Sequence, residues 1–273
     1  MDHGFLIDDV RYAVPGIEVV TWRDSPEAAI FAMSPEDGCP RPKDTRIRLI
    51  VLHTTTGRMP QKLLPGRGPV GDLAERNARY WATSKKQASA HLILDHDGSW
   101  VQIADLLKTI TYHAGSEENP GVNSVSLGIE IAIDHQGRLY EAQMQSLVTV
   151  LDALTRHPKI PVPRQFHDGP WPVPQVASRF RGLIAHRDVG NRGEGDCGPE
   201  PYKALRAAGY DACDVSKDAH LALWRERQAW LNTRAVAESL QPLRVDGDPG
   251  SKTWELAQRF MPPYGQWVQR PGD

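Results

Sequence analysis

The stretch Arg46-Ile47-Arg48-Leu49-Ile50-Val51-Leu52 reads as a β-strand that alternates at first, becomes wholly apolar and delivers His53 at its C-terminal end. A second short strand, Gly182-Leu183-Ile184-Ala185, likewise leads into His186, and Asp196 follows ten residues later. Two imidazoles and a carboxylate from distant segments are the usual protein ligands of a hydrolytic zinc ion with water in its fourth position. The sequence therefore predicts a zinc site at these strand ends.

Between these strands, predicted helices and strands are mixed along the chain. The expected elements are a helix over 72–83, a hairpin of strands 90–94 and 99–103, a strand over 126–133 and an amphipathic helix over 141–157. Strands mixed with helices predict an α/β fold in which helices flank a central mixed sheet. We read residues 1–45 as an N-terminal extension, 46–212 as the catalytic domain and 213–273 as a small helical C-terminal region.

Composition sets limits on partners and location. The 273 residues are 40% hydrophobic, enough for a full core, and the net charge of -2 predicts no field for nucleic acid. The N-terminus lacks a secretory signal, and no run approaches the ~18 apolar residues of a membrane span. We expect a cytoplasmic chain at synthesis, with no membrane insertion, acting as a monomer.

The cysteines, Cys39, Cys197 and Cys213, are odd in number and form no C-x-x-C pair. Free thiols are therefore expected, with a bridge between Cys197 and Cys213 as the alternative.

Several histidines have simpler interpretations. A single histidine at a strand end, such as His53, is more often a hydrogen-bonded structural residue than a ligand. The remaining ones, His96, His135, His157 and His167, are expected in exposed loops. Asp188 is expected to cap a turn or to accept a hydrogen bond from a ligating imidazole.

Five ordered blocks carry a family resemblance: Ile50-Val51-Leu52-His53-Thr54-Thr55, Ser89-Ala90-His91-Leu92-Ile93, Tyr112-His113-Ala114-Gly115, Ser126-Leu127-Gly128-Ile129-Glu130-Ile131 and His186-Arg187-Asp188-Val189. Over about residues 46–205 the chain resembles zinc-dependent N-acetylmuramoyl-L-alanine amidases of type 2. These enzymes share their fold with peptidoglycan recognition proteins. Within five matching blocks, the ligand interpretation of His53 is favoured over the structural one.

The resemblance implies that His53 and His186 bind Zn²⁺. The third ligand in the family is an Asp or a Cys. Asp196 has the ten-residue spacing of the Asp-type members and is followed by Cys197-Gly198-Pro199, whereas Cys-type members place the thiol eight residues on. We therefore prefer Asp196, with Cys197 as the alternative.

Glu130 falls on the family's catalytic glutamate, which takes a proton during water attack and passes it to the departing amine. Glu194 stands where the family often has Lys or Thr, and a carboxylate cannot stabilise an oxyanion. Arg192 or Arg187 is the candidate replacement. His113 and His91 are candidate contacts to the muropeptide, each with a structural role as the alternative.

The segment 245–253 resembles the signature of small helical peptidoglycan-binding domains, the alternative being a helical extension covering the sheet. These features predict a cell-wall lysin of the phage type, released through a holin-made lesion, with peptidoglycan or muropeptide as substrate. Two alternatives remain open: a cytosolic amidase that recycles soluble muropeptides, and a recognition module that binds peptidoglycan without cutting it.

Overall fold

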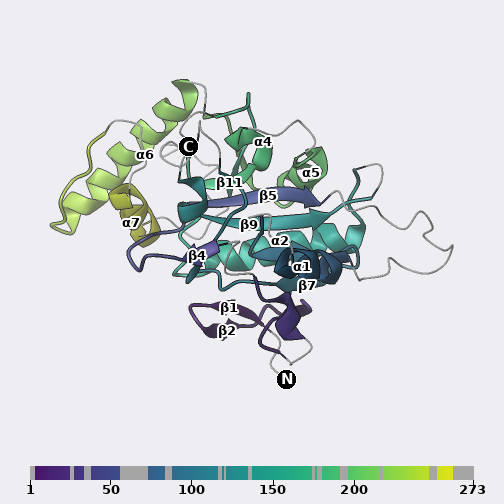
Figure 1. Ribbon diagram of the computed structural model, residues 1–273. Helices are drawn as coiled ribbons and strands as arrows, with labels where there is room; N and C mark the ends of the chain where they lie inside the picture. Colours follow the sequence, from purple (N-terminus) through teal and green to yellow (C-terminus); the bar gives the residue numbers. More distant parts are fainter. Residues whose placement is uncertain are drawn as a thin grey trace.

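An eight-stranded mixed sheet forms the centre of the computed structural model (Figure 1). The structure describes residues 4–24, 28–33, 38–55, 73–83, 88–115, 119, 121–134, 137–173, 176, 180–190, 196–215, 218–245 and 251–260. In spatial order the strands are β12 (Asp211–Cys213), β10 (Gln165–His167), β11 (Gly182–Ala185), β5 (Leu49–Thr55), β9 (Ser126–Ala132), β6 (Leu92–Leu94), β7 (Trp100–Gln102) and β3 (Val19–Thr21). All neighbouring pairs are parallel except the hairpin of β6 and β7. The predicted mixed α/β fold is confirmed.

The central strand β5 lies between β11 and β9 and is buried on both faces. Leu49, Ile50, Val51 and Leu52 are fully buried, which explains why the strand reads as a continuous apolar run. The strand was predicted to end before His53, but it continues to Thr55 because β9 pairs with it along its whole length. His53 therefore lies inside a hydrogen-bonded strand.

Helices cover the sheet from both sides. One core cluster contains Ile50, Leu52, Ile129 and the buried side of α2 (Glu141–Arg156), joined by side chains of α5 (Pro199–Ala207). The opposite face carries Leu49, Val51 and Ile184, and nearer β6 it packs against α1 (Leu73–Thr83). This second face is the one toward which alternate residues of β5, including His53, point.

The predicted amphipathic helix is confirmed as α2, with Leu147, Leu151 and Leu154 buried. Two polar residues share its buried side because each has a hydrogen-bond partner. The Gln143 side chain donates to the Ala132 carbonyl at 2.6 Å, and the Trp100 indole donates to Ser146 Oγ at 2.7 Å.

The described part of the N-terminal extension contributes directly to the sheet. β3 extends the sheet beside β7, and β4 (Gly38–Pro40) pairs with β8 (Thr109–Thr111). The hairpin of β1 (Phe5–Ile7) and β2 (Val10–Tyr12) is attached through Leu6, whose backbone exchanges hydrogen bonds with the Gln102 side chain at 2.7 and 2.8 Å. The described residues of this extension are thus part of the same fold.

Two histidines expected in exposed loops are buried instead. His167 lies in β10, within a proline-rich segment where no strand was predicted, and is 1% exposed. His96, in the turn between β6 and β7, is 3% exposed and packs edge-on against Tyr140. His157 is half-buried, and His135 lies outside the described residues.

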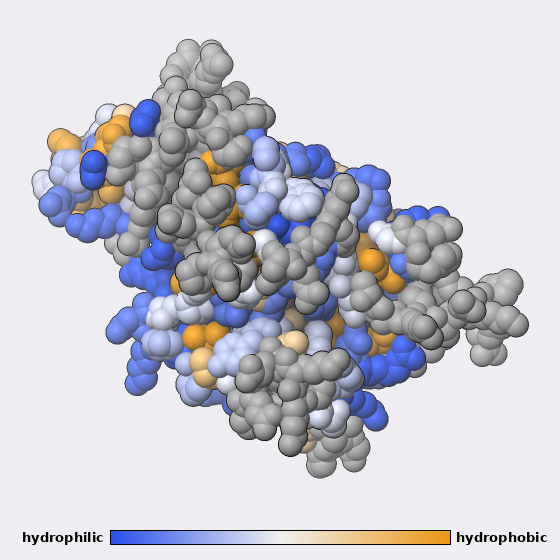
Figure 2. Space-filling view, turned by 45° about the horizontal axis from the view of Figure 1, so that its top comes forward, coloured by the Kyte–Doolittle hydropathy of each residue, from blue (hydrophilic) through white to orange (hydrophobic). Residues whose placement is uncertain are grey.

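The C-terminal region contains the predicted long helix, α6 (Asp218–Ala237), followed by α7 (Ser251–Phe260). Leu231 is buried against Trp230, Leu243, Leu256 and Phe260, so this region has a small apolar cluster of its own. In the part of the chain that the structure describes, no helix is both long and apolar enough to cross a bilayer. On the face in Figure 2, hydrophobic areas among the described residues are small and separated by hydrophilic ones.

Candidate metal centre

Three ligand-type side chains, predicted from distant segments, meet in space. His53 lies near the end of β5, and His186 follows β11 directly as the first residue of the short helix α4 (His186–Val189). Because Ala185 pairs with Leu52 in the parallel ladder, His186 is the next neighbour of His53 across the two strands. Asp196 joins them, and among the described residues these three form the group able to hold a metal ion.

The geometry of this group is compact. His53 Nδ1 lies 2.9 Å from His186 Nδ1, which in turn lies 2.9 Å from Asp196 Oδ2. The three ligand atoms all lie within 4.8 Å of one another. Tetrahedral zinc, at ~2.0–2.2 Å from N and O ligands, places such atoms roughly 3.3 Å apart. The side chains present therefore fit a zinc ion with an open fourth position.

Backbone N–H groups bind both the side chain and the main-chain carbonyl of Asp196. The Thr54 N–H donates to its Oδ1 at 3.0 Å, and the Arg187 N–H donates to its carbonyl at 2.6 Å. Burial alone raises the pKa of this carboxyl, but the hydrogen bond with His186 and the nearby His53 outweigh burial, so the pKa lies below its usual value. The carboxylate is thus ionised and its Oδ2 faces the histidines.

A chain of hydrogen bonds fixes the orientation of His53. Its Nε2 lies 3.1 Å from His113 Nδ1, and His113 Nε2 lies 3.0 Å from Ser126 Oγ, which donates to the Val122 carbonyl at 2.7 Å. If the Nδ1 lone pair of His53 faces the site, the Nε2 proton of His53 is donated to His113 Nδ1, and the Nε2 proton of His113 is donated to Ser126 Oγ. A ligating imidazole that donates its other N–H is held in one tautomer and is a better ligand.

His113 is suited to accept that proton. Burial and the neighbouring His53 hold its pKa well below the usual value, so the ring is neutral. Its backbone is anchored by Asn123 Oδ1, which accepts the N–H groups of His113 and Ala114 at 3.2 and 2.8 Å. The predicted site residue His113 therefore supports His53.

Gly128 makes room for this ring. A Cβ atom at Gly128 would lie 2.6 Å from His113 Cγ, well inside contact distance. Ser126, Gly128 and Glu130 share the face of β9 that carries the site, and the apolar residues between them face the core. This alternation is the sequence signal by which Ser126 and Gly128 could have been recognised.

We expect Gly128→Ala to lower the free energy of unfolding by about 1–3 kcal/mol, because the new methyl group overpacks against His113. Urea unfolding followed by circular dichroism measures the change. Gly198→Ala, whose added methyl group would meet nothing within 4 Å, is the control. In the double variant Gly128→Ala with His113→Ala, the loss of stability should be smaller than the sum of the losses in the two single variants. A Gly128→Ala protein as stable as the parent would contradict the crowding.

Glu130 lies on the strand next to His53. The two residues are register partners in the parallel ladder of β5 and β9, so their side chains leave the same face of the sheet on strands about 4.8 Å apart. Glu130 is half-buried, unlike the fully buried Ile129 and Ile131 beside it. A carboxylate at this place is positioned to exchange protons with a group held by the histidines.

Asp188 caps the helix that begins with His186. Its Oδ2 accepts the Ala185 N–H at 2.8 Å and the Tyr202 hydroxyl at 3.1 Å. The predicted capping role is confirmed, and it fixes the turn that presents His186.

His91, a predicted substrate contact, is enclosed in the protein. It is fully buried: its Nδ1 accepts the Gly128 N–H at 3.0 Å, and its Nε2 lies 3.1 Å from the Thr109 carbonyl. Burial and the nearby Arg41 lower its pKa to about 3. These contacts favour the structural alternative for His91, because both ring nitrogens lie within hydrogen-bond distance of backbone groups. The predicted residues Glu194 and Arg192 lie outside the described residues.

Cys197, the alternative third ligand, faces away from the histidines. Its side chain is fully buried in the core cluster that includes Tyr202 and Leu205. Burial and the adjacent carboxylate of Asp196 raise the pKa of this thiol, which disfavours the thiolate that binds metal. All three cysteines are free, so the alternative bridge to Cys213 is not formed.

Asp196→Asn should weaken zinc binding at least about tenfold to 100-fold. Removing a group that only hydrogen-bonds to a metal ligand already produces a loss of that size. Cys197→Ser should retain the metal, since the thiol faces the core. Zinc content after dialysis against a chelator of graded concentration measures both. Loss of zinc from Cys197→Ser alone would reverse the assignment.

Comparison with known proteins agrees with this arrangement. Residues 43–199, more than half of the chain, match the family described as N-acetylmuramoyl-L-alanine amidase. No curated protein matches the chain.

Among solved structures, the chain is similar to a selenomethionine derivative of AmpD, with 22% identity, 71% of this chain and 95% of that chain covered, and a TM-score of 0.41. An endolysin amidase, LysCS from Clostridium intestinale, matches with 18% identity, coverage of 72% and 96%, and a TM-score of 0.41. The Drosophila peptidoglycan recognition protein SD matches with 16% identity, coverage of 73% and 99%, and a TM-score of 0.46.

The family match over residues 43–199 places the molecule among proteins that bind or cleave peptidoglycan. The chain belongs to the type 2 N-acetylmuramoyl-L-alanine amidase family.

Proposed function

We propose that this protein is a zinc-dependent hydrolase of the amide bond between the lactyl group of N-acetylmuramic acid and the L-alanine of the stem peptide. The observation that carries the proposal is the convergence of His53, His186 and Asp196, with Glu130 on the next strand. A recognition module that only binds peptidoglycan has no need for a general base beside three ligand-type side chains. The retained set therefore favours an enzyme over the recognition module.

The roles of the side chains follow from their positions. His53 Nδ1, His186 Nδ1 and Asp196 Oδ2 would hold the ion, while His113 and Ser126 keep His53 in the ligating tautomer. Zinc bound there would polarise the scissile carbonyl and acidify the attacking water. Glu130 would accept the proton of that water and deliver it to the amine nitrogen of L-alanine as the C–N bond breaks.

Mass spectrometry of products tests the proposal. The purified protein is incubated with a soluble muropeptide, and the expected products are a free peptide with an N-terminal L-alanine and a sugar with an intact lactyl carboxylate. Removing the metal with a chelator should stop the reaction, and adding zinc back should restore it. Binding without cleavage by the zinc-loaded protein would identify a recognition module instead.

We further propose that the protein acts on the cell wall as a lysin of the phage type, made in the cytoplasm and released through a holin-type lesion. Residues 46–212 would form the catalytic domain and 213–273 a wall-binding region. The separate apolar cluster around Leu231 supports an independent role for α6 and α7. Residues 246–250, the middle of the segment 245–253 that resembles a wall-binding signature, lie outside the described residues.

Comparing substrates separates a lysin from a recycling enzyme. A lysin should cleave intact sacculi at a rate comparable to that for soluble fragments, whereas a recycling amidase should cleave only soluble anhydro-muropeptides. A strong preference for the soluble substrate would reject the lysin and keep the amidase.

A further inference from the structure

A cavity of about 1000 Å³ opens at the other end of the strands that carry the metal ligands. The segment 40–46 leads into β5, and Arg181 immediately precedes β11, so the cavity lies by the N-terminal ends of both strands. His53 lies near the C-terminal end of β5, and His186 follows the C-terminal end of β11. The four steps from Leu49 to His53 alone span about 13 Å along β5. The cavity is therefore distinct from the metal centre.

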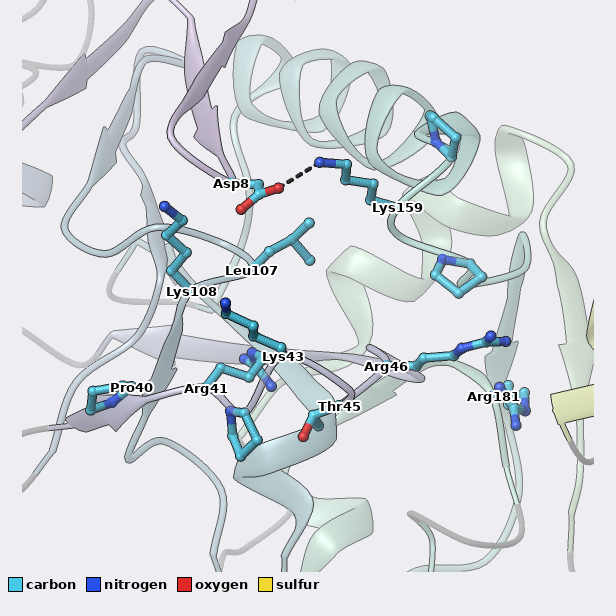
Figure 3. Close-up of a pocket in the computed structure, with 13 residues that line it drawn as sticks. Asp8, Pro40, Arg41, Lys43, Thr45, Arg46, Leu107, Lys108, Lys159 and Arg181 are labelled. Carbon is cyan, nitrogen blue, oxygen red and sulfur yellow. Dashed lines mark hydrogen bonds and ion pairs between the residues drawn. The ribbon is translucent and has the colours of Figure 1, made fainter.

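Its described lining is strongly cationic (Figure 3). Four segments contribute six cationic side chains: Arg41, Lys43, Arg46, Lys108, Lys159 and Arg181. One carboxylate, Asp8, also lines the cavity. The whole chain has a net charge of -2, so positive charge is concentrated here against the overall balance. Cations that line one concave wall attract anions more strongly than the same charges dispersed over a surface.

Two of the cations that line the cavity pair with carboxylates. Lys159 pairs with Asp8 at 2.5 Å, and Lys108 pairs with Asp9 just outside the lining. Asp105 also lies near Lys108. Lys43 and Arg46 are exposed. Arg41 has a different role, since its buried guanidinium donates to the Thr109 and Ser126 carbonyls at 2.8 and 3.0 Å. Arg41 therefore holds the backbone beside the cavity in place and is not available to a ligand in the way that the exposed cations are.

The size of the cavity and its uncharged lining residues indicate which class of anionic ligand fits. Small-molecule pockets span ~300–1,000 Å³, so a cavity of this size holds several linked groups better than one inorganic anion. The described uncharged lining residues are Leu107, Thr45 and the prolines Pro40, Pro42, Pro158 and Pro161, with no aromatic side chain among them. Single-stranded nucleic acid is usually held by stacking on aromatic rings. A concave wall also fits a flat anionic bilayer poorly.

We propose that this cavity binds a flexible polyanion with small, non-aromatic repeats, namely a polyol-phosphate chain. Its phosphodiester groups would contact Lys43, Arg46, Lys108 and Lys159 in succession, and the polyol units would lie over the prolines and Leu107. Binding here does not use the metal ligands, so metal-free and zinc-loaded protein should bind the polymer equally.

Fluorescence titration with a labelled poly(glycerol phosphate) oligomer at low ionic strength tests the site in the full chain. The double variant Lys43→Glu and Arg46→Glu should weaken binding at least about tenfold, because each change replaces an attraction by a repulsion. The control, Lys203→Glu with Lys252→Glu, carries the same charge change on exposed helical positions outside the cavity and should bind within about twofold of the parent. Equal losses in both double variants, or no loss in the first, would overturn the site.

Competing probes test the ligand class. Inorganic phosphate, poly-L-glutamate, oligodeoxythymidine and vesicles of phosphatidylglycerol and phosphatidylcholine should each compete at least about tenfold more weakly, since none combines linked phosphates with small flexible repeats. Stronger binding of the oligonucleotide or the vesicles would replace the proposed ligand. Cleavage of a soluble muropeptide by Lys43→Glu with Arg46→Glu should equal that of the parent, so failure of this site and failure of the amidase proposal give different results.

Discussion

Replacing His53 by alanine is expected to remove both the bound zinc and the amidase activity. In the proposed site His53 Nδ1 lies 2.9 Å from His186 Nδ1, and the two ligands that remain without it do not make a hydrolytic zinc site. The parent protein should carry about one zinc per chain. Metal analysis of dialysed protein and muropeptide cleavage measure the two losses together.

His157→Ala is the matched control, since this half-buried histidine packs against Tyr12, away from the cluster. It should keep both metal and activity. Because His53 is buried and partners His113, its removal also costs about 1–3 kcal/mol of stability. Circular dichroism should therefore verify that the variant is folded, and His186→Ala provides an independent test. Full zinc occupancy in a folded His53→Ala or His186→Ala protein would remove that residue from the site.

Glu130→Gln should separate metal binding from catalysis. Glutamine keeps the size and hydrogen-bonding ability of the side chain but cannot accept the proton of the attacking water. General base catalysis is typically worth ~100-fold to 10,000-fold, so turnover should fall by about that factor while zinc content and muropeptide affinity stay unchanged. Steady-state cleavage, zinc analysis and a binding titration measure the three quantities.

Glu141→Gln, an exposed carboxylate in the first turn of α2, controls for the loss of one negative charge. It should leave turnover unchanged. A folded, zinc-loaded Glu130→Gln protein with near-parental turnover would refute the proposed base. A loss of metal together with activity would instead indicate that Glu130 acts by holding the site together.

The largest elements were predictable because each carries enough residues to show its period. The strand around Ile50 and helix α2 lie where alternation or helical spacing placed them. The strands β6 and β7 are short, but the turn residues Asp97-Gly98 between them predict the hairpin. Strands β3, β10 and β12 have three residues each, too few for a period, and they are extended because neighbouring strands pair with them. The burial of His167 follows from that pairing.

The sequence by itself determined the mixed α/β fold, the two strands that deliver His53 and His186, and the placement of Glu130 within an apolar strand, since these depend on local patterns of burial. Only the tertiary structure distinguished between candidate residues whose surroundings in the sequence are similar. Asp196 and Cys197 are adjacent, yet one reaches His186 and the other enters the core. His91 and His113 both come from the motif blocks, yet only His113 contacts His53. The cationic cavity was equally hidden, because net charge sums over a chain whereas binding depends on where segments distant in sequence bring their charges together.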